Sequence, residues 1–130
     1  MKTRGAAFNK LESALRDYAM TFPGATEDFP WGERVAKVNK KVFVFMGQGD
    51  AGFGMSVKLP QSLEHALALE YTEPTHYGLG KHGWVTAHLD QASNISVDLL
   101  RAWIEESYRA VAPKKRIAEL DEKSKKKNRR

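Results

Sequence analysis

The fold is decided by a stretch in which mostly apolar residues lie on both sides of a short polar turn, Arg34-Val35-Ala36-Lys37-Val38-Asn39-Lys40-Lys41-Val42-Phe43-Val44-Phe45-Met46. Short apolar runs bounded by turn residues are typical of β-strands, so we expect strands over Arg34–Val38 and Val42–Met46. The intervening Asn39-Lys40 predicts a tight hairpin. Because strands joined by so short a turn pair antiparallel, this stretch predicts the centre of an antiparallel sheet.

The flanking sequence adds further strands and the helices that cover them. Beyond a glycine-rich loop at residues 47–52, Phe53–Lys58 alternates again, with Met55 and Val57 on one face and Ser56 and Lys58 on the other. A further strand is expected over Gly83–Leu89. Apolar residues at steps of three and four predict helices over 6–22, 60–69 and 97–111, the last with Ser96 as its N-cap. The order predicts an α+β fold, an antiparallel sheet of about five strands with helices on one face.

Composition limits the class of protein. A chain of 130 residues with 42% hydrophobic residues suits one packed domain. No apolar run reaches the roughly 18–20 residues of a membrane helix. The chain has no cysteine, which excludes disulfides, thiolate metal sites and cysteine nucleophiles. We expect a cytoplasmic protein that does not enter membranes, with a monomer as the default state.

The net charge of +5 is unevenly distributed along the chain. Residues 113–130 hold nine basic and three acidic side chains, which gives +6, whereas residues 1–112 hold twelve and thirteen, which gives −1. The sequence therefore predicts an α+β domain over 1–112 and a basic, disordered tail over 113–130. Such a tail would contact nucleic-acid phosphates without reading base sequence.

The stretch 77–85 is the candidate for a second binding surface. Glycines at 78, 80 and 83 suggest positive φ angles or a close backbone approach. Lys81, His82 and Trp84 follow in or beside this loop, and the strand pattern places Trp84 on the exposed face of the sheet. There a cation could contact phosphate and an indole could stack on a base. The alternative is that Trp84 packs under a helix, since tryptophans are highly buried on average, and that Lys81 is solvated.

No pattern in the sequence requires an enzyme, a metal or a cofactor. His82 and His88 lie six residues apart on one strand, roughly 20 Å at about 3.3 Å per residue, so they cannot share an ion. His76 could approach His82 only if its loop folds back. The adjacent pairs Glu27-Asp28 and Glu105-Glu106 point in different directions and are no acid–base dyad. We expect no catalytic residues, no metal ligands and no cofactor.

Several segments together resemble the MmcQ/YjbR family over about residues 8–112. They are the stretch 22–32 with Val35-x-Lys37-Val38, the strand Ser56-Val57-Lys58, the loop Tyr77-Gly78-Leu79-Gly80-Lys81-x-Gly83-Trp84-Val85, and the helix Leu99-Leu100-x-x-Trp103-Ile104-x-x-Ser107-Tyr108. The resemblance implies a small α+β domain of the frataxin-like or double-wing type. It also implies a DNA-binding protein.

The sequence hypothesis is therefore an MmcQ/YjbR-like protein that binds DNA weakly and mainly through charge. The expected contacts comprise a sheet and loop group and a tail group: Arg34, Lys37, Lys58, Lys81, His82 and Trp84, then Lys114, Lys115, Arg116, Lys125, Lys126 and Lys127. The alternative is a small-molecule or protein-binding module that uses the sheet face and the 71–84 loop, with an apolar pocket beside Trp84.

Overall fold

The structure is a computed structural model of the chain that describes residues 6–29, 33–47, 54–76, 78–91 and 94–128. Most of the glycine-rich loop at 47–52 therefore lies outside the described residues. The helices are α1 (Ala6–Ala19), α2 (Leu63–Leu67), α3 (Val97–Val111) and α4 (Lys114–Asn128), with short 3-10 helices η2 (Leu79–His82) and η3 (Leu89–Gln91). The strands are β1 (Ala25–Asp28), β2 (Arg34–Val38), β3 (Lys41–Gly47), β4 (Gly54–Lys58), β5 (Thr72–Pro74) and β6 (Trp84–His88).

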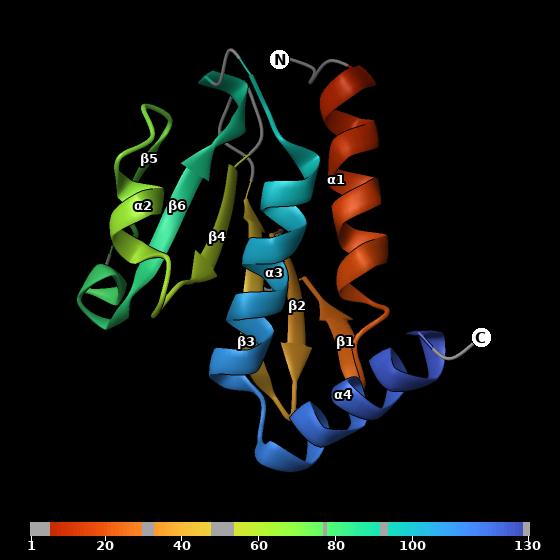
Figure 1. The fold of residues 1–130 in the computed structure, drawn as a ribbon. Coiled ribbons are helices and arrows are strands. Elements are labelled where there is room, and N and C mark those ends of the chain that lie inside the picture. The colour runs from red at the N-terminus through yellow and green to blue at the C-terminus, as the bar shows by residue number, and fades with distance from the viewer. Residues whose placement is uncertain (1–5, 30–32, 48–53, 77, 92–93, 129–130) are drawn as a thin grey trace.

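The strands form one six-stranded sheet in the order β1-β2-β3-β4-β6-β5, and each neighbouring pair is antiparallel. Helices α1 and α3 lie side by side over one face of this sheet (Figure 1). The predicted α+β class and its antiparallel sheet are confirmed. The predicted strands form its middle, and the short edge strands β1 and β5 were not among them. Each edge strand is only three or four residues long, too short for alternation to stand out.

The main hydrophobic core lies between the sheet and the helices. Val44, Val57 and Val85 share a row across three neighbouring strands, and each is at most 1% exposed. Leu100 and Ile104 of α3 are fully buried in the same cluster. Alternation along β4 places Met55 and Val57 in this core and leaves Ser56 and Lys58 half-buried on the other face, as predicted.

One polar contact fixes α3 on the sheet. The register between β2 and β3 shifts at Ala36/Lys37. The pairing between β3 and β4 ends nearby, at the pair Val44 and Val57. Beyond that end, the buried Ser107 hydroxyl donates to the carbonyl of Phe43 at 2.6 Å and accepts from the backbone N–H of Lys58 at 2.8 Å. The hydroxyl therefore bridges the two strands where they separate.

The neighbouring Tyr108 ties α3 to the turn after α1. Its ring is fully buried and packs against Phe22 and Phe43, with centroids 4.9 and 5.2 Å away. Its hydroxyl donates to the carbonyl of Pro23 at 2.7 Å. Desolvation raises the pKa of Tyr108, so the phenol keeps its proton at neutral pH.

Helix ends follow the local sequence, with one difference. The Ser96 side chain accepts the backbone N–H of Leu99 at 3.2 Å, which confirms the predicted N-cap. The second helix is shorter than predicted and begins at Leu63 rather than at Pro60. The Glu106 carboxylate of α3 accepts the backbone N–H groups of Gln61 and Ser62, which accounts for the non-helical turn there.

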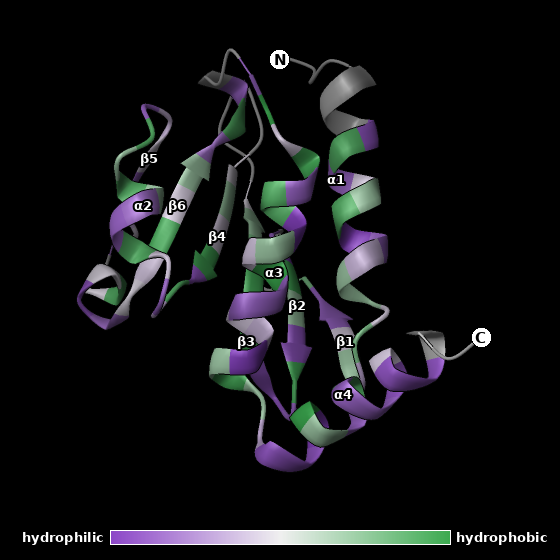
Figure 2. Ribbon diagram, in the orientation of Figure 1, coloured by the Kyte–Doolittle hydropathy of each residue, from purple (hydrophilic) through white to green (hydrophobic). Residues whose placement is uncertain are grey.

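The prediction of a disordered tail over 113–130 is wrong for the described residues, because Lys114–Asn128 form α4. Leu120 is only 6% exposed and belongs to the core cluster, and Ile117 packs against it. Two polar contacts between α4 and the body add to this packing. Arg109 of α3 pairs with Asp121 of α4 at 2.9 Å, and Lys123 of α4 donates to the carbonyl of Thr21 at 2.6 Å. Lysine, glutamate and leucine favour helix, and two anchored apolar residues suffice to dock it. The remaining surface of α4 is hydrophilic (Figure 2).

Replacing Ser107 with alanine should destabilise the fold. Ser107→Ala leaves the Phe43 carbonyl and the Lys58 N–H without their partner, at a cost of about 2–4 kcal/mol in the free energy of unfolding. Urea unfolding of wild type and variant measures this difference. Ser124→Ala, at an exposed position of α4, is the matched control and should change stability by less than about 0.5 kcal/mol. A similarly small effect of Ser107→Ala would contradict the bridging role.

Removing the buried anchor of α4 should loosen this helix. Leu120→Ala should cost about 2 kcal/mol and increase amide hydrogen exchange over residues 114–126, with β3 and β4 still protected. Lys125→Ala, which changes an exposed position, is the control. Unchanged exchange and stability in Leu120→Ala would show that the helix is not docked.

Candidate nucleic-acid interface

Arg34 lies on the helix-covered side of the sheet, in an ion-pair network. Its Nε is 3.3 Å from Oε2 of Glu12, and its Nη1 is 3.4 Å from Oε2 of Glu27. Arg16 of α1 makes two further hydrogen bonds of 3.0 Å to Glu27, and these lower the pKa of that carboxyl. The network joins α1 to β1 and β2, so the predicted phosphate contact at Arg34 is already engaged by carboxylates.

The other face of the sheet carries Lys37 and Lys58 among acidic and neutral side chains. Lys37 Nζ lies 3.3 Å from Oδ2 of Asp28. The pKa of Asp28 is lowered by a hydrogen bond from the Phe29 N–H and by Lys37. Lys58 is half-buried and paired in register with Trp84. The described part of this face is mixed in charge and does not form a positive stripe.

Trp84 is on the predicted face, but its ring is buried rather than exposed, and it packs against Phe45 rather than under a helix. The residue is only 8% exposed, and its ring meets that of Phe45 edge-on with centroids 5.4 Å apart. Strand β4 lies between β6 and β3 in the sheet, so the two large rings meet across β4. Base stacking needs an accessible aromatic face, and Trp84 does not offer one.

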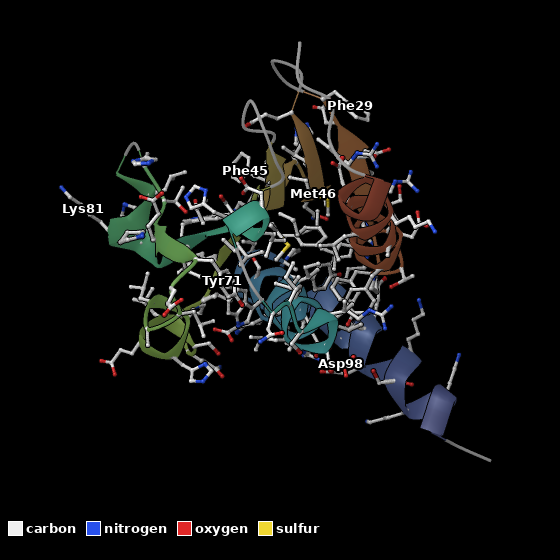
Figure 3. The ribbon with its side chains drawn as sticks, turned by 90° about the horizontal axis from the view of Figure 1, so that it is seen from above. Phe29, Phe45, Met46, Tyr71, Lys81 and Asp98 are labelled. Atoms are coloured by element: carbon white, nitrogen blue, oxygen red, sulfur yellow. The ribbon has the colours of Figure 1, made fainter. Side chains whose placement is uncertain are left out.

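Lys81 and His82 occupy an exposed corner at the end of η2. The helix is bounded by Gly78 and Gly83, with φ angles of 78° and 86°, and a β-carbon on Gly80 would lie 2.8 Å from Cβ of Pro74. The predicted positive φ angles, at Gly78 and Gly83, and the predicted close approach, at Gly80, are thus confirmed. Figure 3 shows Lys81 pointing outward on the opposite side of the molecule from α4. The loop and tail groups therefore do not form one surface.

The lysines of α4 form the second group of predicted contacts. Lys114, Lys115, Lys125 and Lys126 are exposed, and none of them has an ion pair within the described residues. The pair Lys114 and Lys115 lies about 16 Å along the helix axis from the pair Lys125 and Lys126, at about 1.5 Å per residue. Lys127 is in the last turn of the helix, and its side chain is outside the described part.

Arg116 differs from these lysines because protein groups hold it. It pairs with Glu119 at 2.9 Å and donates to the side-chain oxygen of Asn39 at 3.3 Å. It also lies against Gly24, where a β-carbon would be 2.7 Å from its Nε. Glycine at position 24 thus makes room for the guanidinium, and Arg116 attaches α4 to the body.

Lys40 and Lys41 are functional candidates that sequence reasoning missed, because it treated Lys40 only as part of the turn and gave Lys41 no binding role. Both are exposed at the tip of the β2–β3 hairpin. The Arg116–Asn39 contact places this tip beside the first turn of α4, as Figure 1 also shows. The available signal was three consecutive polar residues at the turn, two of them lysines.

A polar cluster occupies the open face at the β5 edge. Thr86 shares hydrogen bonds with Ser56 and Thr75, at 2.7 and 2.9 Å. Glu73 contacts His88 directly and lies 3.6 Å from His76. Within the residues that the structure describes, no group of three or more His, Cys, Asp or Glu could hold a metal ion.

A cavity lies on the helix side of the molecule rather than beside Trp84. It has a volume of about 450 Å³ and is lined by the turn at Pro60 and by α3 residues that include Ala102, Glu105 and Arg109. Glu105 and Arg109, one turn apart on α3, pair with each other at 2.9 Å within this lining. Its lining is therefore not the apolar pocket that the alternative hypothesis expects.

These features define the class of protein: an α+β domain with helices on one face of an antiparallel sheet and a basic helix at its C-terminal end. The family model for YjbR matches residues 20–110, so the chain belongs to the YjbR family. No curated protein matches the sequence. Among the described helices, none has the length and apolar character needed to cross a membrane. The whole of α4 lies beyond the family match.

The Arg16–Glu27 contact should make stability depend on pH in the acidic range. Because Arg16 lowers the pKa of Glu27 in the folded state, this stabilisation is present above the unfolded pKa and is lost as pH falls through the folded value. Glu27→Gln should therefore destabilise most at neutral pH, with the difference shrinking below about pH 4. Urea unfolding from about pH 7 to about pH 3 measures it.

The control for this prediction is Glu70→Gln, at an exposed position without an ion pair in the described chain. Its unfolding free energy should follow that of wild type at every pH. A Glu27→Gln profile that runs parallel to wild type through the acidic range would contradict the assigned role of the Arg16 contact.

Proposed function

We propose that this chain binds DNA weakly and mainly through charge, with the exposed lysines of α4 as its principal phosphate contacts. The main support for this proposal is a difference in ion pairing. Arg34 and Lys37 of the sheet have carboxylate partners, whereas within the described residues no ion pair is formed by the α4 lysines Lys114, Lys115, Lys125 and Lys126. A lysine without a carboxylate partner can replace the counterions of a phosphate backbone without first breaking a contact.

The distribution of charge supports local rather than global attraction. Residues 113–130 carry +6 and residues 1–112 carry −1. Binding of this kind follows the backbone and does not depend on base sequence, because lysine side chains that contact phosphates carry no sequence information directly. The chain has no cysteine, which suits a reducing compartment, and we place this activity in the cytoplasm.

Lys58, Lys81 and His82 remain a smaller second surface in this proposal. Lys81 and His82 are exposed, but they lie away from α4 on the opposite side of the molecule (Figure 3). One straight stretch of DNA at α4 would not reach them. We therefore expect their contribution to affinity to be minor.

The second candidate is a small-molecule or protein-binding module that uses the open sheet face and the 71–84 loop. The hydroxyl groups of Ser56, Thr75 and Thr86, with Glu73 and His88 beside them, favour it. Such a row of donors and acceptors suits a polar ligand. This candidate predicts no salt-dependent affinity for DNA.

Charge removal on α4 separates the two candidates. With about four phosphates neutralised, the logarithm of the wild-type affinity should fall with the logarithm of salt concentration with a slope of about −4. The double variants Lys114→Gln/Lys115→Gln and Lys125→Gln/Lys126→Gln should each weaken binding about tenfold or more and reduce the slope by about 2. Fluorescence anisotropy with a labelled DNA duplex measures both quantities.

The matched control is Lys10→Gln/Arg101→Gln, which removes the same charge from exposed positions of α1 and α3. If binding depended on net charge alone, the control would weaken it as much as the α4 variants do. Equal losses would therefore refute the assignment to α4, and absence of salt-dependent binding by wild type would favour the second candidate.

A further inference from the structure

Lys40 has a backbone conformation that glycine adopts more easily. Asn39 and Lys40 form the two-residue turn between β2 and β3, with φ angles of 50° and 69°. Hairpin turns in which both residues have positive φ favour asparagine followed by glycine. Asn39 follows this preference and Lys40 does not, although a β-carbon is strained in this region. A strained residue of this kind points to a use for its side chain.

The turn is fixed against α4. The side-chain oxygen of Asn39 accepts from Arg116 Nε at 3.3 Å, and Arg116 is held in turn by Glu119 and by the close approach to Gly24. Lys40 and Lys41 therefore project from the body next to the first turn of α4. Sequence positions more than seventy residues apart meet at this corner.

Positive charge at this corner is not balanced by protein groups. Lys40, Lys41, Lys114 and Lys115 are exposed and have no ion pair within the described chain, and the nearby Glu119 is engaged by Arg116. Like charges held close together repel one another, and a bound polyanion removes this cost. A phosphodiester backbone supplies several negative charges at regular spacing.

We infer that Lys40 and Lys41 form one phosphate-binding corner with Lys114 and Lys115, so that DNA contacts the hairpin tip as well as α4. The inference rests on the proposed function and extends it into residues 20–110, the part matched by the YjbR family. The strain at Lys40 is then retained because the ammonium group at the turn contacts the nucleic acid.

The test compares stability and DNA binding in the same variants. Lys40→Gly relieves the strain and removes the charge, so its melting temperature should equal or exceed that of wild type. Its affinity for a labelled 20-base-pair duplex should fall about three- to tenfold near 0.1 M salt, with the salt slope reduced by about 0.9. Lys40→Gln should lose the same affinity, Lys40→Arg should bind like wild type, and Lys10→Gln is the distant control.

The outcomes separate this inference from the proposed function. If both Lys40→Gly and Lys40→Gln bind like wild type while the α4 double variants bind weakly, the corner is refuted and the function of α4 stands. A loss confined to Lys40→Gly also refutes the corner, because it would then reflect the turn rather than the charge. If wild type shows no salt-dependent binding, both the inference and the proposed function fail.

Discussion

The hydroxyl group of Ser107 joins the helix layer to the sheet at the point where β3 and β4 separate. It accepts the Lys58 N–H and donates to the Phe43 carbonyl, so it satisfies two backbone groups that would otherwise be buried without partners. Hydrophobic packing alone tolerates small rotations of a helix, because it is not directional. The two hydrogen bonds of Ser107 are directional, and both of their partners are backbone groups of the sheet. They therefore fix the orientation of α3 on the sheet.

The orientation of α3 determines where the C-terminal helix can lie. Tyr108 follows Ser107 and holds the turn at Pro23 through its hydroxyl. The next residue of that turn, Gly24, provides the surface on which Arg116 rests, and Arg116 also reaches Asn39 at the hairpin tip. The basic corner is therefore a consequence of contacts that begin in the core, and its geometry is not set by charged residues alone.

The sequence predicted those parts of the fold that depend on local periodicity. Short apolar runs and alternation located the central strands, alternation located the buried face of β4, and Ser96 marked the start of α3 correctly. Alternation also placed Trp84 on the right face, but it cannot show that Phe45 of another strand covers the ring. The engagement of Arg34 by Glu12 arises from pairing between distant segments. The docking of α4 was missed because its apolar anchors are Ile117 and Leu120, too few for a clear pattern, and its polar contacts are to distant segments.

A body with a net charge near −1 can still present a surface that attracts a polyanion. At about 0.1 M salt, exposed charges separated by more than about 10 Å are largely screened from each other. Figure 1 shows α2 and α4 on opposite sides of the molecule, so an acidic residue of α2 such as Glu64 has little effect at α4. What a phosphate backbone meets is the local excess of lysines. The position of charges therefore bears more directly on the proposed activity than their sum does.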